Sequence, residues 1–408
     1  MPLPSLAEPV LRVALLGSTG SIGRQTIEVL EAHADRFRVI ALAAGRNIAE
    51  LEQQARRLRP AVVALADEAG LLDLPSGTTR VGGADALEAL ATREDVDLVV
   101  VGTSGIHALR PVLAALDAGR IVATANKEAI VAGGHLVMAR ARALANARAS
   151  VSPADAGASP LAWVRPIDSE HSAIWQSLAG ERRGAVARLL LTASGGPFLD
   201  TPIEELAAVT PDRALQHPVW RMGAKITIDS ATMANKGLEV IEAHWLYDVG
   251  YDAIEVVIHP QSVVHSAVVF VDGSLKAQLG TPDMRLPIQY ALTYPERLAS
   301  PATPPDLVSA ARLEFRAPDE ARFPVLRIAR EAGRIGGRAS AALIAADDVA
   351  VERFLGGTIG FTEIPALLET AVERFGGGND QAPDVAELIE LDREIRATFA
   401  AGPAGGTP

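Results

Sequence analysis

The sequence predicts an α/β protein in three parts: an N-terminal doubly wound parallel sheet, a central α+β domain and a C-terminal helical bundle. Short apolar runs alternate with segments of helical period in the first third of the chain. A hairpin pattern follows in the middle, and the last quarter is almost entirely of helical period. The length of 408 residues also exceeds what one hydrophobic core usually serves, which favours several domains.

The N-terminal part contains apolar runs that we expect to form strands, and these are Leu11–Leu16, Phe37–Ala44, Ala61–Ala66, Leu98–Gly102 and Ile121–Ala125. Between them lie segments rich in Ala, Leu, Glu and Arg with apolar residues at helical spacing, the first of them at Gln25–His33. Strands that alternate with helices in this way predict a parallel sheet with helices on both faces.

The middle of the chain has a mixed pattern. Composition shifts at Ala147–Pro160, where Ala, Ser, Pro and Gly predict an exposed loop near a domain boundary. Strand-like runs follow at Leu189–Thr192 and Lys225–Ile228. The segment Val263–Leu279 predicts a hairpin that turns at Asp272-Gly273-Ser274. This pattern is typical of an α+β domain.

The C-terminal part begins after a proline-rich connector at Pro301–Pro305. Nearly all of Arg322–Phe399 has a helical pattern with glycine-rich breaks, which predicts a small helical domain. The tail GPAGGTP has no apolar residue to pack, and we expect it to be mobile.

Composition limits the function. Hydrophobic residues make up 49% and charged residues 22%, as in ordinary soluble globular proteins, and the net charge of −12 argues against general binding of nucleic acid or anionic membranes. The chain has no cysteine, so disulfides, thiolate metal sites and cysteine nucleophiles are excluded. We find neither a leader-like N-terminus nor an apolar run of about 18 residues, so we expect a cytoplasmic protein.

The glycine cluster GSTGSIG, residues Gly17 to Gly23, lies between the first expected strand and helix. Glycines there let backbone N–H groups approach a pyrophosphate at the positive end of the helix, as in Rossmann-like domains. The spacing is GxxGxxG rather than GxGxxG, and a purely structural turn is the alternative interpretation.

The end of the second expected strand bears on the choice of dinucleotide. NAD-binding proteins often place an acidic residue there, whereas this chain has Gly45-Arg46-Asn47. Arg46 can face a 2′-phosphate, so NADP is favoured over NAD. The alternative is that Arg46 is an ordinary exposed arginine.

Polar residues are dense in three segments, which are Ala125–Glu128, Asp168–His171 and Ser230–Glu239. Each follows a strand-like run, and the carboxyl ends of parallel strands meet at one crevice. Asp168, Glu170 and Glu239 together offer three hard oxygen ligands that suit Mg²⁺ or Mn²⁺. The alternative is that Asp168 or Ser169 caps the helix that starts near His171.

The segment around Lys236 has the features of a phosphate site. Asn235 and Glu239 share one helix face, with Lys236 beside them and Ser230 or Thr232 as the expected cap. A lysine and hydroxyls at a helix N-terminus suit a phosphate, although Glu239 itself could also neutralise the lysine. Ser194, followed by two glycines at the end of another strand, can add donors.

The segment His217–Met222 combines a histidine, an aromatic residue and a methionine, and Pro218 and the following Gly223 disfavour a helix. It predicts a loop that closes over a ligand, with a packed tryptophan corner as the alternative. His259 and His265 flank apolar strand residues, and we interpret them as core or interface histidines.

Taken together, these residues resemble the 1-deoxy-D-xylulose 5-phosphate reductoisomerase family. The family's motifs occur in order along the chain, from about Val13 to the C-terminal helices, and read GSTGSIG, ANKE, DSEH, SGGPF, HPVWRMG, IDSATMANKGLE and HPQSVVHS. The resemblance implies an enzyme that uses NADPH and a divalent metal, Mg²⁺ or Mn²⁺ with Co²⁺ as a further candidate, on a sugar-phosphate substrate.

The resemblance also implies roles for individual residues. Those expected at NADPH are Thr19, Gly20, Ser21, Ile22, Gly45, Arg46, Asn47, Asn126, Glu128 and Gly223. The implied metal ligands are Asp168, Glu170 and Glu239, which with Lys127 form the implied catalytic group. The implied lid contains Trp220 and Met222. The residues implied to contact the substrate are Lys127, Ser169, Glu170, Ser194, His217, Ser230, Asn235, Lys236 and Glu239.

The implied reaction is a metal-assisted rearrangement of 1-deoxy-D-xylulose 5-phosphate to an aldehyde, which NADPH reduces to 2-C-methyl-D-erythritol 4-phosphate in the non-mevalonate isoprenoid pathway. We expect a homodimer, and a division into an NADPH-binding domain (1–158), a central α+β catalytic domain (159–294), a linker (295–320), a helical domain (321–400) and a tail (401–408). The alternatives are a metal-independent NADP dehydrogenase and a non-catalytic NADP-binding regulator.

Overall fold

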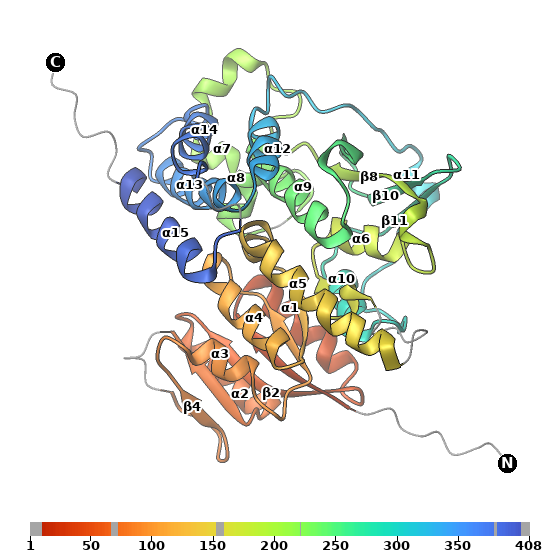
Figure 1. Ribbon diagram of the computed structural model, residues 1–408, viewed down its shortest axis with the longest axis vertical. Coiled ribbons are helices and arrows are strands. Elements are labelled where there is room, and N and C mark those ends of the chain that lie inside the picture. Colours follow the sequence, from red (N-terminus) through yellow and green to blue (C-terminus); the bar gives the residue numbers. More distant parts are fainter. Residues whose placement is uncertain (1–9, 67–71, 152–158, 221, 379–381, 401–408) are drawn as a thin grey trace.

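The N-terminal sheet of this computed structural model has seven parallel strands (Figure 1). The structure describes residues 10–66, 72–151, 159–220, 222–378 and 382–400. The strand order is β4-β3-β2-β1-β5-β6-β7. The strands are β1 (Leu11–Leu16), β2 (Phe37–Ala44), β3 (Val62–Leu65), β4 (Thr79–Val81), β5 (Leu98–Val101), β6 (Ile121–Thr124) and β7 (Val164–Pro166).

The order of the strands reverses between β1 and β5, which makes this a doubly wound sheet with its switch point at their carboxyl ends. Strands β3 and β5 are buried along their whole length and contain only Val, Ala and Leu, as expected where helices cover both faces. The connecting helices are α1 (Ser21–Ala32), α2 (Ile48–Leu58), α3 (Ala86–Ala91), α4 (Leu109–Asp117) with the short η1 (Ile106–Ala108), and α5 (Lys127–Val151). The predicted fold class is confirmed.

The second sheet has the order β11-β10-β8-β9. Its strands are β8 (Val186–Ala193), β9 (Ile254–Ile258), β10 (Val264–Phe270) and β11 (Leu275–Leu279). Strands β10 and β11 form the predicted antiparallel hairpin, and Asp272 in its turn accepts a hydrogen bond from the Ser274 N–H. The elements around this sheet are η3 (Pro160–Ala162), α6 (Ser169–Ser177), η4 (Arg183–Ala185), η5 (Ile203–Ala208), α7 (Pro211–Ala214), α8 (Ala224–Thr232), α9 (Ala234–Tyr247), η6 (Tyr251–Ala253), α10 (Arg285–Thr293) and α11 (Leu307–Ala310).

The strand expected at Lys225–Ile228 is wrong, because this segment lies in helix α8. Its β-branched residues favour a strand locally. In the helix, Lys225 and Asp229 lie one turn apart and form an ion pair of 2.7 Å, which adds a contact that the local pattern does not show. The segment that follows, Ser230–Glu239, therefore begins inside a helix and does not follow a strand.

The loop expected at Ala147–Pro160 is partly wrong. Helix α5 continues to Val151, and η3 begins at Pro160. Residues 147–151 extend the helix because alanine and arginine are strong helix formers. The rest of the expected loop, residues 152–158, lies outside the described residues, as does the expected mobile tail at 401–408.

The C-terminal helices are α12 (Val325–Ile335), α13 (Gly337–Leu355), α14 (Glu363–Phe375) and α15 (Val385–Ala400). The expected helical pattern of Arg322–Phe399 is confirmed. Helix α13 is the centre of this group, since it packs against α12, α14, α15 and also α5. In Figure 1 these blue helices lie beside α5, which runs between them and the N-terminal sheet.

A close approach of α5 and α9 positions side chains for the site. An added Cβ at Gly134 would lie 2.3 Å from Cγ of Trp245, so only glycine lets the two helices come this close. Helix α5 begins at Lys127 and α9 carries Glu239, and their side chains meet beyond this contact.

Candidate functional site

The glycine cluster lies at the switch point of the N-terminal sheet. Gly17 has φ +88°, and an added Cβ would be 2.7 Å from the Gly102 carbonyl carbon at the end of β5. Helix α1 begins directly after the turn, and its N-cap, Gly20, offers no side chain to the helix N–H groups. Thr19, Gly20, Ser21 and Ile22 thus surround an uncapped helix N-terminus, which favours an anion.

A cavity of about 460 Å³ opens beside this turn at the carboxyl ends of β1, β2 and β3, and Gly17 and Gly45 are among its lining residues. Arg46 is exposed next to it. Asn47 is the N-cap of α2, and its Oδ1 accepts a hydrogen bond of 3.2 Å from the Glu50 N–H. The expected adenosine residues are therefore together at one rim.

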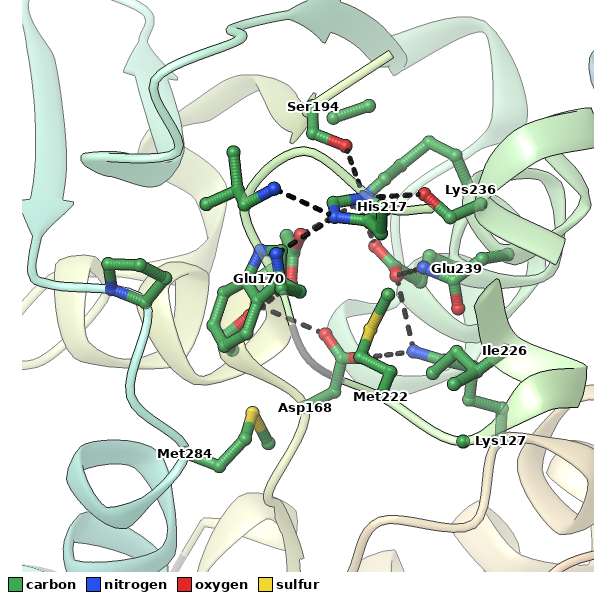
Figure 2. A pocket seen from close by; sticks show the side chains of 18 of the residues that line it. Lys127, Asp168, Glu170, Ser194, His217, Met222, Ile226, Lys236, Glu239 and Met284 are labelled. Atoms are coloured by element: carbon green, nitrogen blue, oxygen red, sulfur yellow. Dashed lines mark hydrogen bonds and ion pairs between the residues drawn. The ribbon is translucent and has the colours of Figure 1, made fainter. Parts of the chain in front are cut away.

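A second cavity, of about 480 Å³, collects most of the expected site residues (Figure 2). It joins the start of α1 to the ends of β7 and β8 and to helices α8 and α9. The expected residues that line it are Ser21, Ile22, Lys127, Asp168, Ser169, Glu170, Ser194, His217, Trp220, Met222, Gly223, Ser230, Asn235, Lys236 and Glu239.

Lysines and carboxylates form a network of ion pairs at the centre of this cavity. Lys127 Nζ contacts the Asp168 carboxylate and lies 3.2 Å from Oε1 of Glu239. Lys236 Nζ lies 3.1 Å from Oε1 of Glu170 and also contacts Glu239. The Glu239 side chain is fully buried, so it is held between two ammonium groups without solvent.

Burial and neighbouring charges shift the pKa values of these groups. Burial, together with the carboxylates of Glu239 and Asp168, raises the pKa of Glu170 to about 7 against the attraction of Lys236. Burial also opposes ionisation of Asp168, but Lys127 lowers its pKa below the ordinary value. The pKa of Lys127 is raised well above its ordinary value, because the carboxylates outweigh the effect of burial.

Asp168 also caps a helix. Its Oδ1 accepts hydrogen bonds from the backbone N–H groups of Glu170, at 3.0 Å, and His171, at 3.3 Å, and it is the N-cap of α6. Its Oδ2 faces Lys127. The capping interpretation and a role in the site are therefore both compatible, because each uses a different oxygen.

His171 is a site residue that the sequence interpretation used only to mark a helix. Ligand atoms of Asp168, His171 and Glu239 lie within 4.8 Å of one another, whereas Glu170 is outside this group. The Nε2 atom of His171 lies 3.0 Å from Oε2 of Glu242, and the ring is fully buried. Its position on α6, one turn from its Asp168 cap, was the available signal.

His217 forms hydrogen bonds at the end of the cavity where Ser194 lies (Figure 2). Its Nδ1 accepts hydrogen bonds from the N–H groups of Val219 and Trp220, at 3.1 and 2.8 Å. The proton must then be on Nε2, which lies 3.1 Å from each of the Ser194 and Ser230 hydroxyls. Burial lowers the pKa of His217, which favours this neutral form.

The expected cap of the Lys236 helix is only partly right. Thr232 Oγ1 accepts from the Ala234 N–H at 3.3 Å, but Met233 is the N-cap of α9 and Ser230 lies in α8. The predicted shared face is confirmed, since Asn235 Nδ2 donates to Oε1 of Glu239 at 2.7 Å.

Asn126 and Glu128 are not among the residues that line the cavity of about 480 Å³. The Asn126 amide donates to the Thr103 and Gly105 carbonyls, and its Oδ1 accepts from the Ala129 N–H at the start of α5. Glu128 is buried in the first turn of α5. In this structure Asn126 therefore ties the loop after β5 to α5.

An apolar wall of the cavity was missed from the sequence. Ile226, Met233 and Met284 line it, and Met284 comes from the start of α10, far along the chain. Single apolar residues carry no motif, so only their convergence identifies them.

His259 and His265 are buried. The ring of His259 forms a hydrogen bond with the Glu314 carbonyl, and the ring of His265 forms one with the Thr281 carbonyl.

Comparison with known families accounts for this arrangement. The family model of 1-deoxy-D-xylulose 5-phosphate reductoisomerase matches residues 13–134. Two family models of the C-terminal domain of this enzyme match residues 164–247 and 279–398. The chain is 52% identical over 361 residues to the enzyme of this name from Thermomicrobium roseum, which covers 88% of this chain and 89% of that protein. The chain belongs to the 1-deoxy-D-xylulose 5-phosphate reductoisomerase family.

Another reductoisomerase, from Pelotomaculum thermopropionicum, is 49% identical over 390 residues, covering 94% of this chain and 96% of that protein. Among solved structures, the Zymomonas mobilis reductoisomerase in complex with NADPH has a TM-score of 0.85 and 38% identity, covering 96% of this chain and 99% of that chain. A reductoisomerase in complex with NADPH, fosmidomycin and magnesium also has a TM-score of 0.85, with 37% identity and coverage of 96% and 98%. The resemblance found in the sequence motifs is confirmed.

Proposed function

We propose that this protein converts 1-deoxy-D-xylulose 5-phosphate to 2-C-methyl-D-erythritol 4-phosphate, with NADPH and a divalent cation, in the non-mevalonate isoprenoid pathway. One observation supports this most directly. The carboxylates of Asp168, Glu170 and Glu239 share one cavity with Ser21 and Ile22 of the glycine turn. A cation site and a dinucleotide site therefore open onto the same space.

The residues around the glycine turn fit NADPH. The close approach of Gly17 to β5 and the uncapped N-terminus of α1 leave room and N–H donors for a pyrophosphate. We assign the adenosine end to the cavity lined by Gly45, with Arg46 at the 2′-phosphate and Asn47 beside it. Gly223, at the N-terminus of α8, lines the large cavity and would face the other end of the cofactor, near Asn126 and Glu128.

The acidic residues fit a divalent cation, Mg²⁺ or Mn²⁺, with Co²⁺ as a further candidate. Asp168, Glu170 and Glu239 offer only hard oxygen donors, and the Nε2 atom of His171 already faces Glu242. Burial is the main cause of the raised pKa of Glu170, with the carboxylates of Glu239 and Asp168 adding to it, and a bound cation would favour the ionised form. When bound, the cation would polarise the substrate's carbonyl and hydroxyl oxygens, and NADPH would supply a hydride.

The chain's own residues bind and orient the sugar phosphate. We assign the phosphate to Ser194, Ser230, His217, Asn235 and Lys236, because the His217 Nε2–H and two hydroxyls converge there with an ammonium group nearby. The neutral form of His217 keeps its Nε2–H aimed at this end.

Lys127 and Ser169 face the reacting end of the substrate. Lys127 stays protonated because the pKa of its ammonium group is raised, so its Nζ can donate to an oxygen on which negative charge develops. Ser169 lines the cavity beside the carboxylates and can donate to a substrate hydroxyl.

We assign the lid to the segment around Trp220 and Met222. Both side chains line the cavity and are half-buried, and the turn at their N-terminal side is held by Nδ1 of His217. A closed lid would exclude water from the aldehyde between rearrangement and reduction.

We also propose a homodimer in the cytoplasm, with the domain division given by the sequence. Strand β11 is an edge of the second sheet. Its first residue, Leu275, is 54% exposed, and Val271 in the preceding turn is 70% exposed. Such an edge suits pairing with a second copy across a two-fold axis.

The N-terminal sheet includes β7, so this sheet extends past the proposed domain boundary at residue 158. None of the helices in the described part of the chain has the length and apolar character needed to cross a bilayer.

The test is oxidation of NADPH by the purified protein in the presence of 1-deoxy-D-xylulose 5-phosphate, followed at the nicotinamide absorbance with Mg²⁺ and with EDTA. We expect turnover that EDTA abolishes and Mg²⁺ restores. Turnover that survives EDTA would favour a metal-independent dehydrogenase. NADPH binding without turnover would favour a non-catalytic regulator.

A further inference from the structure

A second cluster of buried charges surrounds Lys225, outside the cavity described above. Lys225 Nζ lies 2.7 Å from Oδ2 of Asp229, 2.5 Å from Oδ2 of Asp347 and 3.4 Å from Oδ1 of Asp348. Asp347 and Asp348 belong to α13, 122 and 123 residues further along the chain. Arg396 of α15 contacts Asp348 and extends the cluster.

The carboxylates of this cluster depend on Lys225. The side chains of Asp229 and Asp347 are 5% and 1% exposed, and in the described part of the chain the Oδ1 atom of each has no hydrogen-bond partner. Buried carboxylates without a cation are costly. Burial opposes the charge on Lys225, but these carboxylates raise its pKa well above the ordinary value, so it remains an ammonium ion. Lys225 thus holds α8 against α13.

The position of Lys225 links the cluster to the cavity. It lies in the first turn of α8, two residues after Gly223, which lines the cavity with Met222. The same helix carries Ile226 and Ser230, which also line it. Among the described residues, those that line the cavity lie between Ser21 and Met284, so the described parts of the C-terminal helices act on it through other elements.

We infer that Lys225 is a positioning residue for the reaction, through which the C-terminal helices α13 and α15 hold the lid residues Trp220 and Met222 and the hydroxyl of Ser230 over the substrate. This inference rests on the proposed function. The ion pairs fix the end of α8 from which the lid departs, and the helix then sets the direction of the Ser230 hydroxyl toward His217. Loss of the tie is expected to displace both from the phosphate.

The test compares Lys225→Met with Lys225→Arg. We expect Lys225→Met to lower kcat/KM for the sugar phosphate about tenfold or more, mainly by raising its KM, since small displacements of positioning groups have effects of this size. Lys225→Arg keeps a cation and should restore most of the activity. Lys225→Met/Asp347→Asn, which leaves fewer buried charges unpaired, covers the case in which the single variant does not fold.

A spectroscopic measurement separates positioning from general stability. Fosmidomycin is titrated into each variant while tryptophan fluorescence is followed, and the signal that disappears in Trp220→Phe is assigned to the lid. We expect that signal to weaken in Lys225→Met at temperatures well below its melting point. The control is Arg327→Met, which breaks an exposed tie between α12 and α14 that does not reach α8.

The outcomes are distinct. A lower melting temperature with unchanged KM and unchanged lid signal in Lys225→Met overturns the inference, because the cluster would then only stabilise the fold. An inactive wild-type protein would instead contradict the proposed function.

Discussion

The Nζ atom of Lys236 lies 3.1 Å from Oε1 of Glu170, and the same ammonium group also contacts Glu239. A cation of the chain itself therefore stands beside two of the carboxylates that we assign to the metal. A divalent ion held by these carboxylates would compete with the ammonium group of Lys236 for their oxygens. Lys236 would then be available to the substrate phosphate.

This competition predicts opposite effects of Lys236→Met on two ligands. The variant should bind Mg²⁺ more tightly than the wild type and inorganic phosphate more weakly, each by about tenfold, because one charge of this kind shifts an equilibrium by that order. Isothermal titration calorimetry with each probe alone measures both. Lys276→Met, which removes a lysine from a surface ion pair with Glu181, is the control. Weaker Mg²⁺ binding in Lys236→Met would contradict the competition.

The fully buried Glu239 predicts a large loss of activity in Glu239→Gln. The substitution removes one proposed metal ligand and one partner of both Lys127 and Lys236. We expect kcat to fall at least about a hundredfold, since the Lewis acid contributes several kcal/mol to such steps. Steady-state NADPH oxidation measures this, and circular dichroism controls for folding. Full turnover would favour a metal-independent dehydrogenase.

The exposed position of Arg46 beside the adenosine cavity predicts its effect on cofactor choice. Arg46→Ala should raise the KM for NADPH about tenfold and leave that for NADH nearly unchanged, because only NADPH has the 2′-phosphate. Arg57→Ala, near the other end of α2 and paired with Glu31, is the matched control. An unchanged ratio of the two Michaelis constants in Arg46→Ala would show that the 2′-phosphate lies elsewhere.

His265 predicts a pH dependence of stability. Burial lowers the pKa of His265 from 6.5 to about 4, so the unfolded chain binds its proton at a higher pH than the folded chain. The stability from its neutral form is complete above pH 6.5 and is lost as the pH falls toward 4. Between pH 7.5 and 5 this amounts to about 2 kcal/mol. Urea unfolding of wild type and His265→Gln measures it, and the variant should lose less stability over this range. Equal losses would show that His265 titrates normally.

Gly17 predicts a steric cost that a matched glycine does not share. Both Gly17 and Gly77 have φ +88°. An added Cβ at Gly17 would meet Gly102 at 2.7 Å, whereas at Gly77 it would meet no atom of the described residues within 4 Å. Gly77→Ala should therefore cost about 1 kcal/mol of unfolding free energy, and Gly17→Ala about 3 kcal/mol or more with loss of NADPH binding. Urea unfolding and NADPH titration measure both. Equal costs would mean that the turn at β1 adjusts freely.

Local patterns in the sequence predicted most elements of the fold. Phe37–Ala44 is a strand with the predicted limits, and the hairpin turns at Asp272–Ser274 as expected. Such elements could be predicted because the apolar period and the turn residues lie within one short segment. The strand expected at Lys225–Ile228 failed for the opposite reason, since the ion pairs that favour its helix include a partner 122 residues away.

The site could be predicted as a set of residues but not as an arrangement. The sequence by itself determined the motifs, their order, the exclusion of thiolate metal ligands by the absence of cysteine, and hence the family. Only the tertiary structure decided that two lysines of the chain pair with the carboxylates, that His217 is neutral, and that Lys225 faces α13. These outcomes depend on burial and on distances between segments remote in sequence, because charge interactions strengthen only where folding removes water from around them.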